Sequence, residues 1–206
     1  MTPDNAMDTC CEIRPVPPGQ RRVLQLALAI NAAMFVLESG AGLAASSTAL
    51  LADSVDMAGD AIVYGFSLYA VGRGPLWQSR AAFLKGLVMA AFGVGILVQV
   101  ALKLAHGLTP GVETMSVVGL VALAANLVCL RLLWRHREDD VNMRSAWVCS
   151  RNDVIGNVSV LVAAAAVWLS GSPWPDIVVG LLVAGVFGRS AVAVLADAAR
   201  SYRLAH

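Results

Sequence analysis

The sequence predicts an all-α membrane protein with six transmembrane helices and both the N- and C-termini in the cytosol. Hydrophobic residues make up 58% of the 206 residues and charged residues only 14%, which lies outside the usual range of water-soluble proteins. The apolar residues form six segments of about 20 residues or more, the length that crosses roughly 30 Å of hydrocarbon. Lysine and arginine are distributed very unevenly among the links between these segments.

The six predicted helices follow one another through short links. Each segment is apolar over a membrane-spanning length once the polar residues on one of its faces are allowed. We expect the helices over 23–45, 48–71, 81–104, 112–134, 143–169 and 175–197. The links between them are Ser46-Ser47, Gly72 to Arg80, Ala105 to Gly111, Arg135 to Asn142, and Ser170 to Trp174.

The two ends of the chain are short. We expect residues 1–20 to form a disordered cytosolic leader, because they contain several prolines and lack the basic start and apolar core of a signal peptide. Cys10 and Cys11 in this leader either collect a soft metal ion or are incidental. Residues 21–200 form the predicted six-helix membrane domain. The short tail 201–206 leaves no room for a C-terminal cytosolic domain with its own core.

The distribution of basic residues predicts the orientation in the membrane. With the N-terminus in the cytosol, nearly all lysine and arginine residues lie inside or at the inner boundary, and only Lys103 lies near the outer one. This arrangement satisfies the positive-inside rule. No basic run interleaved with aromatic residues is present, so the expected partner is the lipid bilayer and not nucleic acid.

Three aspartates lie inside the second apolar segment. Asp53, Asp56 and Asp60 are spaced by three and four residues, so they share one face of a helix. A carboxylate at bilayer depth costs at least about 2.5 to 3.5 kcal/mol, so three on one stripe require a cation, a proton or a counter-charge. The structural alternative is pairing with an arginine or lysine of a neighbouring helix.

A second polar stripe lies in the fifth segment. Cys149 and Asp153 are four residues apart and therefore one turn apart on one face of a helix. Across a bundle they could join Asp56 and Asp60 as four oxygen and sulfur ligands, the number that a tetrahedral site for a divalent ion such as zinc requires. Taken alone, Cys149 is more typical of a small buried core residue.

Several short motifs carry a resemblance to one family. They are Asn31 to Glu38, Ser46 to Asp60, Asn142-Met-Arg-Ser-Ala146, Asp153-Val-Ile-Gly-Asn157 and Pro175-Asp176. With these motifs the chain resembles the cation diffusion facilitator (CDF) family of metal/proton antiporters over all six predicted spans. The resemblance implies that a His-or-Asp-x-x-x-Asp pair on each of the second and fifth helices holds the transported metal. Asp56, Asp60 and Asp153 match these ligands directly, and Cys149 stands where the family usually has His or Asp.

The resemblance implies a secondary transporter in a bacterial-type inner membrane. It would export a divalent transition-metal ion from the cytosol, with zinc or cadmium expected, in exchange for protons. Metal ligands bind in their deprotonated form, so loading releases protons and protonation favours release. The chain is not expected to be an enzyme or to hold a cofactor other than the transported ion. A homodimer is usual in the family, and small residues such as Gly40, Gly42 and Gly93 would allow close helix contact.

Other functions of the same fold remain open from the sequence. A carboxylate-rich site also admits cobalt, nickel, iron or manganese, whereas a thiol favours softer ions. The same ligands would serve a non-transporting membrane metal sensor or an intramembrane metalloenzyme. Transport separates these alternatives, because neither a sensor nor an enzyme moves metal across the membrane.

Four further polar residues are expected to be accessory. Asp53 lies toward the outer end of its stripe and fits a helper group better than a ligand. Asn157 is a weak ligand or a hydrogen-bonding group between helices. Glu38 shares a helix face with Asn31 and is either a polar group of the inner cavity or the structural partner of a cation. Arg151 is one cation that could pair with Glu38, and it lies on the face opposite Cys149, so it cannot be a ligand.

Overall fold

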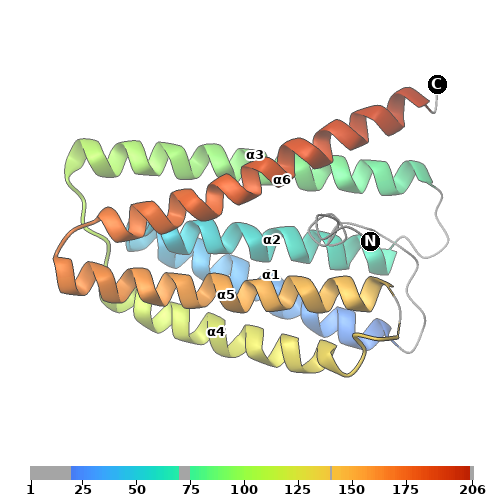
Figure 1. Cartoon of the computed structure of the whole chain (residues 1–206), viewed down its shortest axis with the longest axis horizontal. Helices are drawn as coiled ribbons and strands as arrows, with labels where there is room; N and C mark the ends of the chain where they lie inside the picture. The colour runs from blue at the N-terminus through green and yellow to red at the C-terminus, as the bar shows by residue number, and fades with distance from the viewer. Residues whose placement is uncertain (1–19, 70–74, 140, 205–206) are drawn as a thin grey trace.

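The chain forms a bundle of six long helices (Figure 1), seen in a computed structural model that describes residues 20–69, 75–139 and 141–204. No strand is present within these ranges. The helices are α1 (Arg21–Ala44), α2 (Thr48–Tyr69), α3 (Pro75–His106), α4 (Val112–Trp134), α5 (Val141–Ser170) and α6 (Trp174–Leu204). The predicted all-α fold and the number of helices are therefore confirmed.

Several helix boundaries differ from the predicted ones, and α6 runs to Leu204, past the predicted end at 197 and into the predicted tail 201–206. Helix α3 begins at Pro75 and not at residue 81, so residues 75–80 of the expected Gly72–Arg80 link are helical. Proline is well tolerated in the first turn of a helix because the amide proton it lacks has no partner there. Helix α5 likewise begins at Val141, inside the predicted Arg135–Asn142 link, whereas α4 coincides with the predicted range 112–134.

The helices have the dimensions and composition of membrane spans. In the part of the chain that the structure describes, four are long and apolar enough to cross a bilayer: Arg21–Ala44, Gly86–His106, Val112–Trp134 and Ala146–Ser170. Helix α6 adds a shorter apolar stretch, Trp174–Val186. Helix α2 has the length, with 22 residues, but carries the three aspartates. These properties make the chain an integral membrane protein.

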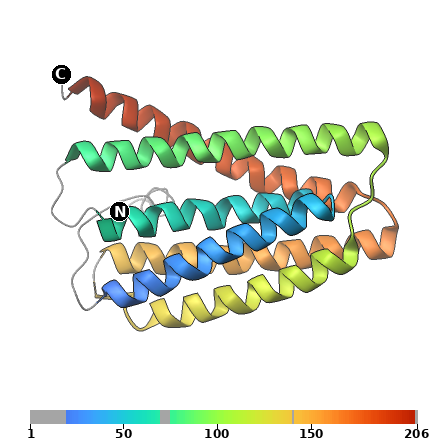
Figure 2. The ribbon, with the colours of Figure 1, turned by 180° about the vertical axis from the view of Figure 1, so that it is seen from behind.

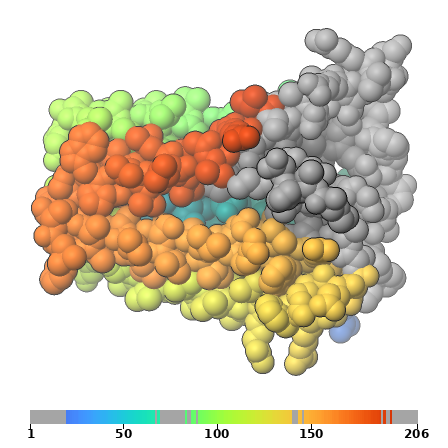
Figure 3. All heavy atoms as spheres, in the orientation of Figure 1, coloured from blue at the N-terminus to red at the C-terminus, as the bar shows by residue number. Residues whose placement is uncertain are grey.

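Helix α2 lies at the centre of the bundle. It contacts α1, α3, α5 and α6, while α4 packs mainly on α5 and α3 packs mainly on α6. Helices α1, α2, α4 and α5 form one group, and α6 crosses α3 along its side (Figures 1 and 2). The space-filling view shows α2 at the floor of a hollow between α5 and α6 (Figure 3).

The two ends of the bundle differ in their connections (Figure 1). We call the end with the α1–α2, α3–α4 and α5–α6 connections the link end, and the other, where α1 begins and α6 ends, the terminal end. At the link end, Gly107 follows α3 with φ +62° and Gly171 follows α5 with φ +63°. Glycine adopts this left-handed conformation at little steric cost, which is why it commonly ends helices. Both helices therefore stop sharply at the same end.

A buried hydrogen-bonding network closes the link end around Asp176. Its carboxylate accepts bonds from the backbone N–H of Thr48 at 2.8 Å and of Ala49 at 3.1 Å, and from the Ser47 hydroxyl at 2.6 Å. The Lys103 ammonium lies 2.6 Å from Asp176 Oδ2, with both side chains fully buried. Asp176 thus satisfies amide groups in the first turn of α2, which a helix alone leaves unpaired. The network joins the start of α2, the end of α3 and the start of α6.

The glycines that were expected to allow close helix contact fall into two groups. A Cβ added at Gly42 would lie 2.9 Å from Leu51 Cγ, so this residue packs α1 against α2 within one chain. A Cβ added at Gly40 or Gly93 would meet nothing within 4 Å. Contact between two copies of the chain through such positions stays a prediction.

We predict that Lys103→Met destabilises the protein strongly. Removing one partner of a buried ion pair costs about 3–5 kcal/mol, because the remaining charge is left uncompensated. Thermal unfolding of the purified protein in detergent would measure the loss. The double variant Lys103→Met/Asp176→Asn should recover part of the stability because it removes the stranded charge. A Lys103→Met protein that melts like the wild type would contradict the role assigned to this pair.

Candidate cation-binding site

The predicted carboxyl stripe of α2 faces the protein interior. Asp53 and Asp60 are each only 2% exposed, and Asp56, between them, is partly buried. Their neighbours Val55 and Met57 are also buried, so α2 is enclosed around most of its circumference at this level. The stripe predicted from the three-and-four spacing is therefore present, and it points away from lipid.

Asp53 packs against the backbone of α5 at a glycine. A Cβ added at Gly156 would lie 2.5 Å from Asp53 Oδ1, closer than real Cβ contacts come. Gly156 therefore provides the space that this carboxyl group occupies. The other oxygen, Oδ2, is buried and has no hydrogen-bond partner. Asp53 links α2 to α5 one turn toward the link end from Asp56.

Asp153 of α5 faces the same stripe. It is fully buried, and it interacts electrostatically with Asp60, Asp56 and Asp53. No described donor group gives a hydrogen bond to either oxygen of Asp153. Carboxylates so placed repel one another in a medium of low dielectric constant, so the arrangement requires protons or a cation between them.

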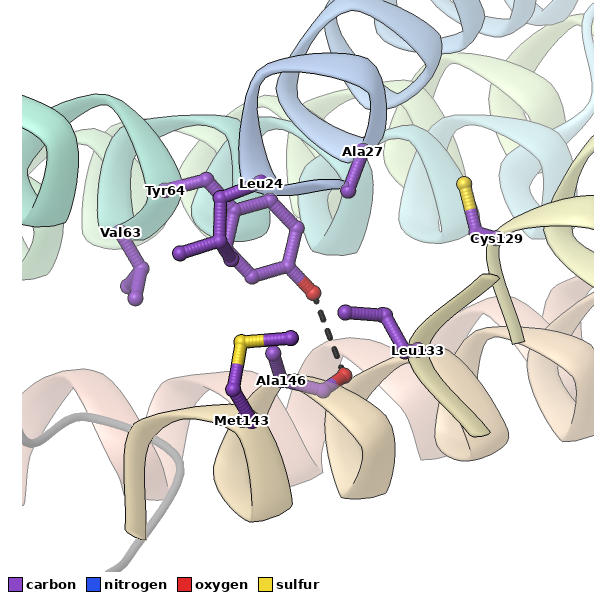
Figure 4. Close-up of a cluster of buried hydrophobic side chains, with 8 residues drawn as sticks. All are labelled: Leu24, Ala27, Val63, Tyr64, Cys129, Leu133, Met143 and Ala146. Atoms are coloured by element: carbon purple, nitrogen blue, oxygen red, sulfur yellow. Dashed lines mark hydrogen bonds between the residues drawn. The ribbon is translucent and has the colours of Figure 1, made fainter. Parts of the chain in front are cut away.

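Asp60 is held by a tyrosine from its own helix. The Tyr64 hydroxyl lies 2.9 Å from Asp60 Oδ2 and 3.3 Å from the backbone oxygen of Ala146 on α5. Figure 4 shows the tyrosine ring among apolar side chains, with its hydroxyl directed at Ala146. Tyr64 thus bridges α2 and α5 beside the predicted ligands.

Cys149, the fourth predicted ligand, is buried on α5. It is 7% exposed and forms no disulfide, and it interacts electrostatically with Tyr64. Cys149, Asp60 and Asp153 therefore all interact electrostatically with Tyr64. Among the residues whose placement is described, however, no three His, Cys, Asp or Glu side chains form a group that could hold a metal ion. The structure brings the four predicted ligands into one region without assembling them into a coordination shell.

The accessory residues lie in the same buried layer. Glu38 is fully buried, neither of its carboxylate oxygens has a hydrogen-bond partner, and it interacts electrostatically with Asp53 and Asp56. Asn31 Nδ2 donates to the Ala27 backbone oxygen at 2.9 Å, and Asn157 Nδ2 donates to the Asp153 backbone oxygen at 2.8 Å. Both amides therefore bond within their own helices. The side-chain oxygens of Asn31 and Asn157 have no partner.

Among the described residues, no cation is found paired with Glu38, which was one of the two alternatives left open for it. Arg151 is exposed, and its guanidinium carbon lies 5.6 Å from the centre of the Trp147 ring. Of the two readings of Glu38, an unpaired polar group of the interior fits the described residues, and a structural partner of Arg151 does not. Cys10 and Cys11 lie outside the described residues.

The structure adds residues that the sequence analysis missed. Cys129 of α4 is fully buried and interacts electrostatically with Asp60. Asn126, one turn earlier, is also fully buried and directs its amide nitrogen at Met57 of α2, with 3.7 Å to the sulfur. Their spacing of three residues on an otherwise apolar helix is the signal that would have placed them on the buried face. Tyr64, four residues after Asp60, carries the same kind of signal.

Comparison with known proteins identifies the family. The sequence profile of the cation efflux transmembrane domain matches residues 77–201, more than half of the chain, and the matched part includes Cys149 and Asp153. Helices α1 and α2 lie outside this matched range, which begins near the start of α3.

Curated relatives match a longer part of the chain. The metal cation efflux system protein CzcD of Cupriavidus metallidurans is 26% identical over 81% of this chain and 57% of its own length. The zinc transporter ZitB of Yersinia pestis is 27% identical over 84% of this chain and 60% of its own length. The cadmium, cobalt and zinc/H(+)-K(+) antiporter of Bacillus velezensis is 22% identical over 87% of this chain and 62% of its own length.

The chain therefore spans about three fifths of the length of these relatives, which run from 57% to 62% coverage. All three carry the names of efflux or transport proteins and none that of an enzyme. The predicted resemblance to the cation diffusion facilitators is confirmed: the chain belongs to the family of the cation efflux transmembrane domain.

Proposed function

We propose that this protein exports a divalent transition-metal ion, zinc or cadmium, from the cytosol in exchange for protons. Relatives named as zinc transporters and as a cadmium, cobalt and zinc antiporter support the class of substrate. The bacterial relatives support an inner membrane as the location. Proton exchange, the ligand set and the cytosolic placement of both termini belong to this proposal.

One observation carries the proposal: an excess of buried oxygen acceptors over donors between α1, α2, α4 and α5. Among the described residues, the buried atoms without a partner include both oxygens of Glu38 and of Asp153, and one oxygen each of Asp53, Asn126 and Asn157. Protein donors do not satisfy them. Protons and metal cations are the species that bind such oxygens, and both are the exchanged species of an antiporter.

The proposed ligands are Asp56 and Asp60 of α2 and Cys149 and Asp153 of α5. Three carboxylates and one thiolate give four ligands, as a tetrahedral zinc or cadmium site requires. Each ligand binds metal in its deprotonated form, so entry of the ion displaces protons and reprotonation expels it. The electrostatic interactions among Asp56, Asp60 and Asp153 support this coupling, because a change in charge at one is felt by the others.

The site lies between two apolar clusters. On the terminal side are Leu24, Val63, Leu133 and Met143, and on the link side a cluster from α2, α4 and α5 that includes Leu50, Met115, Val160 and Ala164. With both termini in the cytosol, the first cluster separates the site from the cytosol and the second separates it from the outside. An ion crosses by parting one cluster at a time, which is alternating access. Lys103, the one lysine or arginine that the sequence places near the outer end, is neutralised by Asp176, which agrees with this orientation.

Cobalt is a second candidate ion. The Bacillus velezensis relative is named for cadmium, cobalt and zinc together, and three carboxylates suit a harder ion than zinc. Cys149 acts in the opposite direction, since a thiolate favours the softer ions. The ion preference should therefore depend on Cys149.

We predict that everted or reconstituted vesicles containing the wild-type protein accumulate zinc or cadmium, and that Asp60→Asn or Asp153→Asn abolishes the uptake. Cys149→Ser should retain uptake but shift the preference toward cobalt, nickel and manganese, because it replaces a soft ligand with a hard one. Uptake of each ion under an imposed pH gradient measures both effects. Asp139→Asn is the matched control, because this carboxylate is 44% exposed beside His136.

If no ion moves above the level of empty vesicles, the transport proposal fails. The alternatives of a membrane metal sensor or an intramembrane metalloenzyme must then be tested by metal binding and by assays of hydrolysis.

We also predict that protons move against the metal. In everted vesicles the lumen corresponds to the outside, so an acidic lumen should drive zinc inward, and added zinc should raise the pH of the lumen. A pH-sensitive dye inside the vesicles measures this change, and Asp60→Asn vesicles are the control. Equal zinc accumulation after a protonophore collapses the gradient would rule out proton coupling.

A third prediction tests the contact between α2 and α5. Gly156→Ala places a methyl group where Asp53 Oδ1 lies, so the helices or the carboxyl group must shift and transport should fall. We expect a loss of stability of about 1–3 kcal/mol, as for other overpacked cores. The control is Gly95→Ala on α3, where a Cβ meets nothing within 4 Å. The same melting temperature and transport rate for both variants would show that the Asp53–Gly156 contact does not position the site.

A further inference from the structure

Tyr64 is a polar residue at the centre of an apolar cluster (Figure 4). The cluster is formed by buried residues of α1, α2, α4 and α5: Leu24, Ala27, Val63, Tyr64, Cys129, Leu133, Met143 and Ala146. Tyr64 is only 2% exposed. A buried tyrosine hydroxyl requires a partner, so its position in an apolar cluster depends on what that hydroxyl binds.

The hydroxyl meets two acceptors with its single proton. Asp60 Oδ2 lies at 2.9 Å and the Ala146 backbone oxygen at 3.3 Å. The bond to an ionised carboxylate is the stronger of the two, because it is shorter and charge-assisted. Tyr64 follows Asp60 by one helical turn, and a long side chain on a helix points back toward the N-terminus, which brings the hydroxyl to the carboxyl group.

The same hydroxyl reaches α5 beside the other proposed ligands. Ala146 precedes Cys149 by three residues, and electrostatic interactions connect Tyr64 with Asp60, Cys149 and Asp153. On α2, Tyr64 lies one turn to the terminal side of Asp60, and Figure 4 shows its ring beside Leu24 and Met143 of the apolar cluster. No ligand role was assigned to Tyr64 from the sequence.

We propose that Tyr64 is a positioning and specificity-determining residue for the transported ion. Its hydroxyl donates to Asp60 Oδ2 and so competes with the ion for that oxygen, which favours coordination by Asp60 through one oxygen only. Its ring closes the terminal side of the site against water. This inference rests on the proposed function, since it assumes that Asp60 is a metal ligand.

Coordination through one oxygen favours particular ions. Zinc takes four ligands in a tetrahedral arrangement, whereas manganese prefers an octahedral arrangement of oxygens. Freed from Tyr64, Asp60 can coordinate through both oxygens and supply an additional ligand. Hydrogen-bonding partners of metal ligands commonly contribute about 10–100-fold to metal affinity, so the loss of the hydroxyl should be measurable.

Tyr64→Phe tests the proposal because it removes the hydroxyl and keeps the ring. Equilibrium dialysis of the purified full chain in detergent would give the dissociation constants of zinc and manganese separately. We expect the zinc constant to rise about tenfold, as expected for a lost partner of a ligand, and the manganese constant to change less. In vesicles, the KM for zinc should rise while the maximal rate is retained.

Tyr69→Phe is the matched control. Tyr69 lies on the same helix and is 52% exposed, outside the apolar cluster around Tyr64. This variant should bind both ions like the wild type. The melting temperatures of the metal-free wild type, Tyr64→Phe and Tyr69→Phe, measured by circular dichroism, show at which temperature all three proteins are folded. The binding measurements are compared at that temperature.

The possible results separate the inference from the proposed function. A wild type that binds and transports zinc, with Tyr64→Phe unchanged in affinity and in the zinc-to-manganese ratio, overturns the role of Tyr64 and leaves the function standing. Equal losses for zinc and manganese overturn the specificity role and leave the positioning role. A wild type that binds neither ion overturns both the inference and the ligand set.

Discussion

The carboxyl groups of α2 must be kept out of hydrocarbon, and the rest of the bundle is arranged to meet that requirement. Asp53 and Asp60 are buried, and α2 is surrounded by α1, α3, α5 and α6. The outward faces of the other helices carry the large apolar residues, such as Val36, Leu97 and Val162. Because α2 is enclosed in this way, its carboxylates are transferred into the protein interior and not into lipid. In the interior, other groups can bind them and so lower the free energy of burying their charge.

The protein interior surrounds its buried carboxyl groups in two opposite ways, with hydrogen-bond donors or with other carboxyl groups. Asp176 is surrounded by donors, from Lys103, Ser47 and the first turn of α2, so its charge is fully compensated. Asp153 is equally buried but faces other carboxyl groups and receives no hydrogen bond from a described donor. A compensated carboxylate fixes helices in place, whereas an uncompensated one can bind and release a cation. The link end therefore holds helices together, and the middle of the bundle is where the proposed exchange of cation and protons would take place.

The elements were predictable from the sequence because their signals are local. The lengths of the apolar segments and the turn residues between them were enough to predict six helices. The spacing of Asp53, Asp56 and Asp60 was enough to predict that α2 has a buried polar face. The pairs that hold the bundle together were not predictable, since Lys103 and Asp176 are 73 residues apart and Tyr64 and Ala146 are 82 apart. Such contacts depend on how the helices pack against one another, and the periodicity of apolar residues in the sequence does not determine this packing. The gathering of Asp153 near the α2 stripe was expected from the resemblance, and its lack of donors came only from the structure.

The three-residue connection between α1 and α2 has a consequence for how the protein enters the membrane. Only Ala45, Ser46 and Ser47 separate the two helices, and the positive φ of Ser46 (51°) reverses the chain within this turn. Helix α1 is apolar enough to enter the bilayer unaided, whereas α2 carries three carboxyl groups that oppose partitioning. Because the turn is this short, we expect α1 and α2 to insert as one helical hairpin, in which the apolar helix offsets the cost of inserting the acidic one. The carboxyl groups of the finished bundle would then enter the membrane together with an apolar neighbour.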